Sequence, residues 1–208
     1  MQQPDVLDVL ERVGAFRAGH FVLVSGRHTD KYINKDAIYP YTHETSALCR
    51  ALAEPFKDAN VEVVVGPAVG AAILSQWAAY HLSEMNGREV LSTYADKEGP
   101  SGLVLRRGYD KLVKGKRVLV VEDLMTTGGS VLKVVNAVRA FGGEVVGVSV
   151  ISNRGNVAID KIGNPPRLVS LVDIQLDSWE AEGCTLCAHK IPVNTDIGHG
   201  KDFVSKQA

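Results

Sequence analysis

Two adjacent carboxylates and a loop of glycines and hydroxyls, within residues 117–130, are the side chains of this sequence best suited to chemistry. Glu122 and Asp123 follow the apolar run 118–121, and the loop TTGGS follows at 126–130. Such a loop can direct several backbone N–H groups and hydroxyls at one anion, helped by the positive end of a following helix. Carboxylates beside a phosphate are useful when the ligand also carries vicinal hydroxyls. The pattern therefore predicts a site for a phosphorylated sugar.

The elements that position this site are predicted to form an open, mostly parallel sheet with helices on both faces. The aliphatic run 118–121 is short enough for a strand buried on both faces. Apolar runs alternate with helical patterns at least twice, which is typical of parallel βαβ units with right-handed crossovers. The expected strands are 61–65, 89–94, 118–121 and 145–151, with one more after residue 168. The expected helices are 4–14, 42–58, 72–84 and 130–141, with a short one near 177–182 and a hairpin within 19–36.

Three loops should meet where the parallel strands end, because open α/β sheets bind ligands at that edge. These loops are 66–71, 95–110 and 122–130. The small residues GPAVGA at 66–71 let the backbone approach a pyrophosphate, although a tight strand–helix turn would explain them equally well. The basic segment 95–117 has the length of a lid or binding loop. The alternative is a solvated surface run beside a short hairpin at 103–105.

The composition is that of an ordinary globular protein. Of the 208 residues, 45% are hydrophobic and 23% charged, with a net charge of -1, which argues against a nucleic-acid coat or a membrane-surface role. No apolar run approaches the ~20 residues that span a bilayer, and the N-terminus is unlike a signal peptide. Three cysteines make no disulfide framework. We expect a cytoplasmic protein that binds neither nucleic acid nor membrane.

The residues 117–130 resemble the phosphoribosyl-diphosphate (PRPP) signature of the type I phosphoribosyltransferases, and 66–71 resembles their pyrophosphate loop. The segment GHFVLVSGRHTDKYI at 19–33 is similar to the opening segment of the orotate phosphoribosyltransferases, which forms a hood over the base. Arg154 follows a strand where that family often has an orotate-binding arginine. The resemblance covers residues 10 to 175. It implies the type I phosphoribosyltransferase fold with a small hood, formed by the N-terminal segment and, as a further expectation, by the tail.

The resemblance also implies an activity: transfer of the phosphoribosyl group from PRPP to orotate, with Mg²⁺ as cofactor and pyrophosphate released. The implied catalytic residues are Glu122, Asp123 and Lys97. The implied PRPP-binding residues are Ala68, Val69, Gly70, Lys97, Arg106, Arg107, Glu122, Asp123, Leu124, Met125, Thr126, Thr127, Gly128, Gly129 and Ser130. The implied base-binding residues are Tyr32, Thr126 and Arg154. Magnesium would be held through the substrate and by Asp123.

The basic lid departs from the family pattern. Only Lys97 is in register with the family's lid residues, no histidine follows it, and Arg106 and Arg107 come later than expected. A serine of the family's hood is Thr29 here, and a substrate-contacting lysine is Val24. Two alternatives therefore stay open: a transferase for another base such as a purine, and a PRPP-sensing regulator without turnover. The resemblance further implies a homodimer whose subunits share active sites.

We expect one domain over residues 1–208, with a hood at about 1–40, a core at about 41–175 and a tail at 176–208. The tail contains Cys184 and Cys187 in a C-x-x-C pair, with His189 and His199 nearby. Such a pair supplies half of a tetrahedral zinc site, which two histidines can complete. A redox pair and two reduced structural cysteines are the alternatives, and the sequence does not choose between the three.

Overall fold

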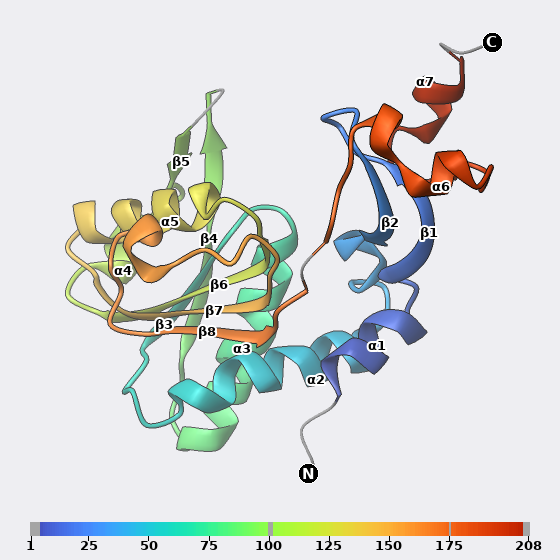
Figure 1. Cartoon of the computed structure of the whole chain (residues 1–208). Coiled ribbons are helices and arrows are strands. Elements are labelled where there is room, and N and C mark those ends of the chain that lie inside the picture. The colour runs from blue at the N-terminus through green and yellow to red at the C-terminus, as the bar shows by residue number, and fades with distance from the viewer. Residues whose placement is uncertain (1–4, 100–101, 175, 206–208) are drawn as a thin grey trace.

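A six-stranded sheet forms the centre of the molecule in the computed structural model, which describes residues 5–99, 102–174 and 176–205 (Figure 1). Its strands are β3 (Val63–Pro67), β4 (Leu91–Glu98), β5 (Gly102–Val104), β6 (Arg117–Met125), β7 (Glu144–Asn153) and β8 (Leu168–Val172). They lie in the order β5-β4-β3-β6-β7-β8, and all neighbours are parallel except β4 and β5. The expected open, mostly parallel sheet is therefore confirmed.

Helices cover both faces of this sheet (Figure 1). They are α1 (Val6–Arg12), α2 (Thr42–Ala53), α3 (Gly70–Asn86), α4 (Tyr109–Val113) and α5 (Gly129–Ala140), with short 3-10 helices at Lys35–Ala37, Glu54–Phe56 and Ile159–Ile162. Leu119 and Val121 of β6 join the core formed with α1, α2 and α3, whereas Val118 and Val120 join the core formed with α4 and α5. Because all four are fully buried, each stabilises the fold by roughly 1.5–3 kcal/mol.

Strand β6 is longer than the apolar run predicts. The run ends at Val121, but the parallel pairing with β7 continues to Met125 opposite Asn153. Glu122 and Asp123 therefore lie within the strand rather than after it, because the backbone ladder, not the apolarity of the side chains, determines where a strand stops. This places both carboxylates on a rigid element at the edge where ligands bind.

The basic segment 95–117 forms a hairpin and a helix in its described part. Strand β5 returns antiparallel along β4, with Lys97 opposite Leu103, and α4 then leads to β6. Residues 100 and 101 of the expected lid lie outside the described residues.

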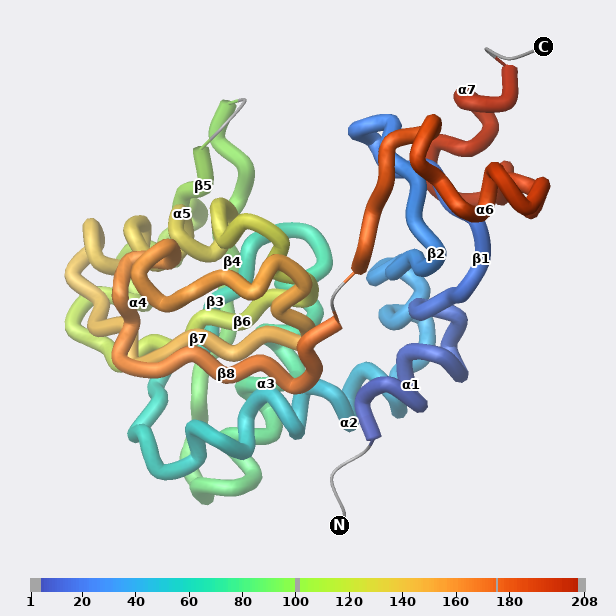
Figure 2. The backbone as a smooth tube through the Cα atoms, in the orientation of Figure 1, coloured from blue at the N-terminus to red at the C-terminus, as the bar shows by residue number. Residues whose placement is uncertain are grey.

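The N-terminal hairpin and the C-terminal tail form a second, smaller lobe beside the sheet (Figure 1). The hairpin consists of β1 (Phe16–Val22) and β2 (His28–Ile33). The tail crosses from β8 to this hairpin (Figure 2) and contains the 3-10 helix Ala181–Gly183, α6 (Thr185–Ala188) and α7 (Gly200–Ser205). The hood expected from the N-terminal segment thus includes the tail as well.

The short helix expected near 177–182 begins later, as the 3-10 helix Ala181–Gly183. Trp179 instead pairs with His28 in an isolated β-bridge, with both backbone hydrogen bonds formed at 2.7 and 2.8 Å. The tail consequently extends the hairpin instead of folding by itself. Among the helices of the described residues, none has the length and apolarity that crossing a membrane requires.

Candidate functional site

A cavity of about 480 Å³ opens where β3, β4 and β6 end, between the sheet and the hood. It is lined by Tyr32, Ile33, Asn34, Lys35, Asp36, Pro67, Ala68, Val69, Gly70, Ala71, Lys97, Glu122, Asp123, Leu124, Thr126 and Ser130. Residues from three distant parts of the sequence thus meet around one space. Of the residues predicted to contact substrate, Tyr32, Lys97, both carboxylates and the loop at 68–70 are all brought together here.

Asp123 is the most heavily coordinated side chain in this cavity. Its Oδ2 accepts hydrogen bonds from Lys35 Nζ at 3.0 Å and from the Tyr39 hydroxyl, and its Oδ1 accepts one from the Leu124 N–H at 2.7 Å. Burial opposes the charged form of Lys35, but attraction to Asp123 outweighs it, so the pKa of Lys35 is raised. Burial and the same carboxylate raise the pKa of Tyr39. The carboxylate is therefore held in one orientation by a cation and a phenol.

Gly70 makes this packing possible. A Cβ atom at that position would lie 2.1 Å from the Tyr39 hydroxyl oxygen and 2.8 Å from Asp123 Oδ2. Both distances are far below van der Waals contact, so no larger residue fits without displacing the Tyr39–Asp123 pair. The first residue of α3 is thus adapted to the site as well as to the turn.

Glu122 differs from its neighbour because it is almost enclosed and has no cation bonded to it. Its Oε1 accepts the Asp123 backbone N–H at 3.0 Å. Burial, followed by repulsion from Asp123, raises the pKa of Glu122 to about 8. A carboxyl group with a pKa raised in this way is common where acids have catalytic or binding roles.

A second cavity of about 170 Å³ lies under the glycine-rich loop and is continuous with the first through shared lining residues. It is lined by Glu122, Leu124, Met125, Thr126, Thr127, Gly128, Gly129, Ser130 and Val131. Gly128, at φ 76°, turns the chain into α5, so the free N–H groups of the first helical turn point at this space. The arrangement suits a phosphate group. Met125 contributes its backbone, because its side chain is in the core.

The loop after β3 forms the opposite wall of the larger cavity. Its peptide bond between Ala68 and Val69 is cis, and the Ala68 N–H donates to the Ala95 carbonyl at 2.8 Å. Val69 is 79% exposed, so its side chain leaves the backbone of the loop accessible. Lys97 is exposed near the end of β4 and lines the same cavity.

Three predicted arginines do not line either cavity. Arg106 pairs with Glu98 at 3.1 Å and Arg107 with Asp96 at 3.3 Å, both on the surface of the β4–β5 hairpin. Arg154 follows β7 directly, and the next residue, Gly155, donates its N–H to the Met125 carbonyl. The turn that carries Arg154 therefore lies against the start of the phosphate loop.

Lys35 and Tyr39 are functional residues that the sequence did not reveal. They lie 88 and 84 residues from Asp123 in the chain, between the hairpin and α2, in a stretch without a periodic pattern. The available signal was a lysine and a tyrosine directly after the hood segment, and this signal is too common to single out a site.

The histidines that approach the tail cysteines also differ from the expected pair. His20 and His28, from the N-terminal hairpin, lie against Cys184 and Cys187. His189 instead lies beside the Thr185 carbonyl and His199 beside Asp202. The prediction that His189 and His199 would complete a set of zinc ligands with the two cysteines is wrong, because the tail folds onto β1 and β2 and not back on itself.

Comparison with known proteins agrees with this geometry. The family described as Phosphoribosyl transferase domain matches residues 36–183, the greater part of the chain. The fold and the paired cavities thus define a phosphoribosyl transferase domain. An orotate phosphoribosyltransferase from Caldanaerobacter subterraneus subsp. tengcongensis is 41% identical over 193 residues, which cover 93% of this chain and 96% of that one. This chain belongs to the orotate phosphoribosyltransferase family.

Solved structures support the same assignment. The orotate phosphoribosyltransferase of Mycobacterium tuberculosis, in complex with Fe(III) dicitrate, superposes with a TM-score of 0.67 at 30% identity, over 82% of this chain and 97% of that chain. The structure of that enzyme in complex with PRPP gives a TM-score of 0.63 at 29% identity, over 82% and 96%.

Proposed function

We propose that this protein transfers the phosphoribosyl group of PRPP to a ring nitrogen of orotate, giving orotidine 5′-phosphate and pyrophosphate. The two cavities would hold the substrates. The observation that carries this proposal is the placement of the two acids: Glu122 lines both a phosphate-sized cavity and a larger one, and Asp123 lines the larger one. PRPP carries a phosphate at one end of its ribose and the leaving group at the other. A site for it therefore needs one binding region for each end, with groups that bind the ribose hydroxyls between them. Family membership identifies the reaction that this arrangement serves.

The sugar end of PRPP would be held by β6 and the loop after it. The N–H groups at the start of α5 and the hydroxyls of Thr126, Thr127 and Ser130 would bind the 5′-phosphate. Glu122 and Asp123 would bind the ribose hydroxyls. As the leaving group departs, positive charge develops on the ribose, as in glycosyl transfer in general. A carboxylate beside the ribose favours that charge, which makes Asp123 the strongest candidate for a catalytic role.

The pyrophosphate end would lie between residues 68–70 and Lys97. The exposed backbone of that loop offers N–H groups, and Lys97 offers a positive charge on the opposite side of the cavity. Both stabilise the negative charge that grows on the departing group. Orotate itself needs no strong general base, because its ring nitrogen is acidic. Tyr32, Thr126 and Arg154 would contact the base, with the guanidinium of Arg154 suited to its carboxylate.

The residues of the site fit a magnesium ion that is bound mainly through the substrate. Mg²⁺ prefers oxygen ligands and is usually held by one or two carboxylates plus substrate phosphates, and Asp123 offers a carboxylate at the cavity. When bound, the ion would neutralise part of the charge on pyrophosphate. Lys35 already contacts Asp123 Oδ2. The ion would therefore take its other ligands from the oxygens of the substrate and not from further protein side chains.

Two further properties belong to the proposal. For a homodimer with shared active sites, the Lys97 that serves a cavity would come from the exposed β4–β5 hairpin of the neighbouring subunit rather than from the same chain. A cytoplasmic location is supported by the three cysteines, all of which are free thiols in the structure.

The test is PRPP-dependent loss of the ultraviolet absorbance of orotate, run beside adenine, guanine, hypoxanthine, xanthine and uracil. Turnover with orotate alone is expected. Asp123→Asn is the matched inactive variant, because it keeps the shape of the side chain and removes its charge. Losing one such contact typically lowers the rate by ~10²–10³. Turnover of a purine in place of orotate would contradict the proposed base, and PRPP binding without turnover of any base would contradict catalysis.

A further inference from the structure

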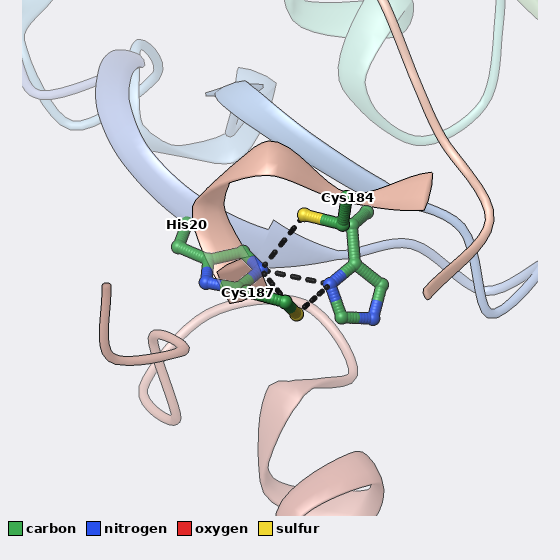
Figure 3. A group of neighbouring side chains, drawn as sticks. His20, Cys184 and Cys187 are labelled. Atoms are coloured by element: carbon green, nitrogen blue, oxygen red, sulfur yellow. Dashed lines mark hydrogen bonds between the residues drawn. The ribbon is translucent and has the colours of Figure 1, made fainter. Parts of the chain in front are cut away.

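Four side chains with nitrogen or sulfur donors meet inside the smaller lobe, away from the reaction cavity. His20 belongs to β1 and His28 begins β2, whereas Cys184 precedes α6 and Cys187 lies within it. One donor atom from each side chain lies within 4.8 Å of all the others. Figure 3 shows Cys184 and Cys187 pointing toward the ring of His20. None of the four lines the proposed reaction site.

Three of the separations between donor atoms are those of a tetrahedral metal site. His20 Nε2 lies 3.6 Å from Cys184 Sγ and 3.7 Å from Cys187 Sγ, and Cys187 Sγ lies 3.4 Å from His28 Nδ1. Zinc bond lengths and the tetrahedral angle give donor separations of roughly 3.3–3.8 Å. The two histidine nitrogens are closer, at 2.7 Å, and would separate by roughly 0.6 Å around an ion.

The ring of His20 is already oriented as a metal ligand. Its Nδ1 lies 2.7 Å from the carbonyl oxygen of Ile191, and a carbonyl only accepts, so Nδ1 carries the proton. In the neutral ring, Nε2 then has a free lone pair directed at the two cysteines. Metal-binding histidines in general donate their other N–H to a carbonyl or carboxylate, which fixes the tautomer and the ring orientation.

Three of the four side chains of the cluster are buried, whereas Cys187 is partly exposed and borders, with His20, a cavity on the outside of the lobe. His20 and Cys184 are 2% exposed and His28 is fully buried. Phe203 packs edge-on against His28 with ring centroids 4.6 Å apart. Polar groups buried in this way are costly unless they are paired or bind a metal. An ion at the centre would satisfy four donors at once.

We propose that His20 Nε2, His28 Nδ1, Cys184 Sγ and Cys187 Sγ bind one zinc ion with a structural role. Two nitrogens and two sulfurs in tetrahedral spacing are ligands that zinc prefers. The protein supplies all four ligands and leaves no position for a substrate, which distinguishes a structural site from a catalytic one. The site is independent of the proposed transferase reaction.

The ion ties the two ends of the chain together. A two-stranded hairpin such as β1–β2 is at best marginally stable alone, and α6 and α7 have four and six residues. The cysteines and histidines that meet here are separated by 156–167 residues. Strand β2 continues from His28 to Tyr32, which lines the reaction cavity. Zinc would therefore hold the tail on the hairpin and the hairpin in the position that completes the cavity.

Metal analysis of the purified protein, after addition of zinc and gel filtration, tests the proposal. One zinc per chain is expected in the wild type, and the Cys184→Ser/Cys187→Ser variant should hold less than about a tenth of that. The matched controls are His189→Ala and His199→Ala, which change the other two histidines of the tail and should retain the metal. A wild type without zinc, retention of zinc by the double cysteine variant, or a disulfide between Cys184 and Cys187 would overturn the proposal.

Two measurements on the wild type keep the test valid if the cysteine variant fails to fold. Cobalt exchanged into the protein should show the visible absorption of tetrahedral Co²⁺ together with thiolate-to-metal charge transfer. Removal of zinc by a chelator should make two further thiols reactive and should expose the backbone N–H groups of His28 and Trp179, which pair with each other, to hydrogen exchange. A cobalt spectrum without thiolate bands would exclude these ligands. Unchanged exchange after metal loss would exclude the structural role.

Discussion

Replacing Glu122 with glutamine should change how the stability of the protein depends on pH. Glutamine has the shape of the protonated carboxyl group and keeps an oxygen for the Asp123 N–H. It removes only the ability to ionise. The perturbation therefore isolates the free energy of charging a carboxyl group that is buried beside another acid.

The direction follows from proton binding. Burial and the neighbouring Asp123 raise the pKa of Glu122 from its ordinary value of 4.5 to about 8 in the folded protein. Between these values the folded state keeps a proton that the unfolded state has lost, so stability falls as pH rises. The favourable contribution is complete below about pH 4.5 and is lost as pH rises to about 8.

The size is an upper limit of about 5 kcal/mol, because each unit of pKa is worth 1.36 kcal/mol and relaxation around the charge reduces the effect. Between about pH 5 and about pH 9, we expect the free energy of unfolding of Glu122→Gln to rise by roughly 2–5 kcal/mol relative to that of the wild type. That is a large part of a typical domain stability of about 5–15 kcal/mol.

The assay is urea unfolding of both proteins, without substrate, at several pH values across this range. Titration of the groups that do not interact with Glu122 is common to both proteins and cancels in the difference. Glu89→Gln, which changes an exposed glutamate, is the matched control and should follow the wild type. A difference between Glu122→Gln and wild type that is independent of pH would refute the reasoning, and so would a variant that loses stability relative to wild type as pH rises.

Three further predictions concern the reaction site. In steady-state kinetics, Arg154→Ala should raise KM for orotate by roughly 10–100-fold, the usual loss for a hydrogen bond to a charged group. Equal changes in KM for PRPP and for orotate would contradict base binding. Mixing inactive Lys97→Ala and Asp123→Asn proteins should restore about a quarter of the activity if a symmetric dimer shares its sites, and no recovery would contradict sharing. Gly70→Ala should lower stability in urea unfolding by about 1–3 kcal/mol, because its Cβ would lie 2.1 Å from the Tyr39 hydroxyl; unchanged stability would show that the Tyr39–Asp123 pair moves freely.

The parts of the site that could be predicted from the sequence are contiguous in it. The carboxylates lie near the end of one strand and the loop at 126–130 follows it, so their mutual position depends on local backbone geometry. Strand β3 and the loop after it follow the same rule. Because parallel strands end at one edge of a sheet, the meeting of these two loops also follows from the alternation of strands and helices.

The cations around the site were harder to predict. Arg106 and Arg107 are as basic as Lys97, but carboxylates on their own hairpin pair with them at the surface. Which of several nearby cations faces a cavity depends on the register of a hairpin and on the partners available, and neither is visible in composition. Lys35 and Tyr39 illustrate the converse, since a segment without periodicity supplies the two groups that hold Asp123.

By itself, the sequence determined the α/β class, the strand that carries the two acids, and the phosphate loop after it, because hydrophobic periodicity and turn chemistry act over a few residues. Only the tertiary structure decided which distant groups meet. It placed Lys35 on Asp123, and it brought His20 and His28 to Cys184 and Cys187. Those contacts depend on how distant segments of the chain pack together. Sequence patterns over a few residues contain no information on that packing.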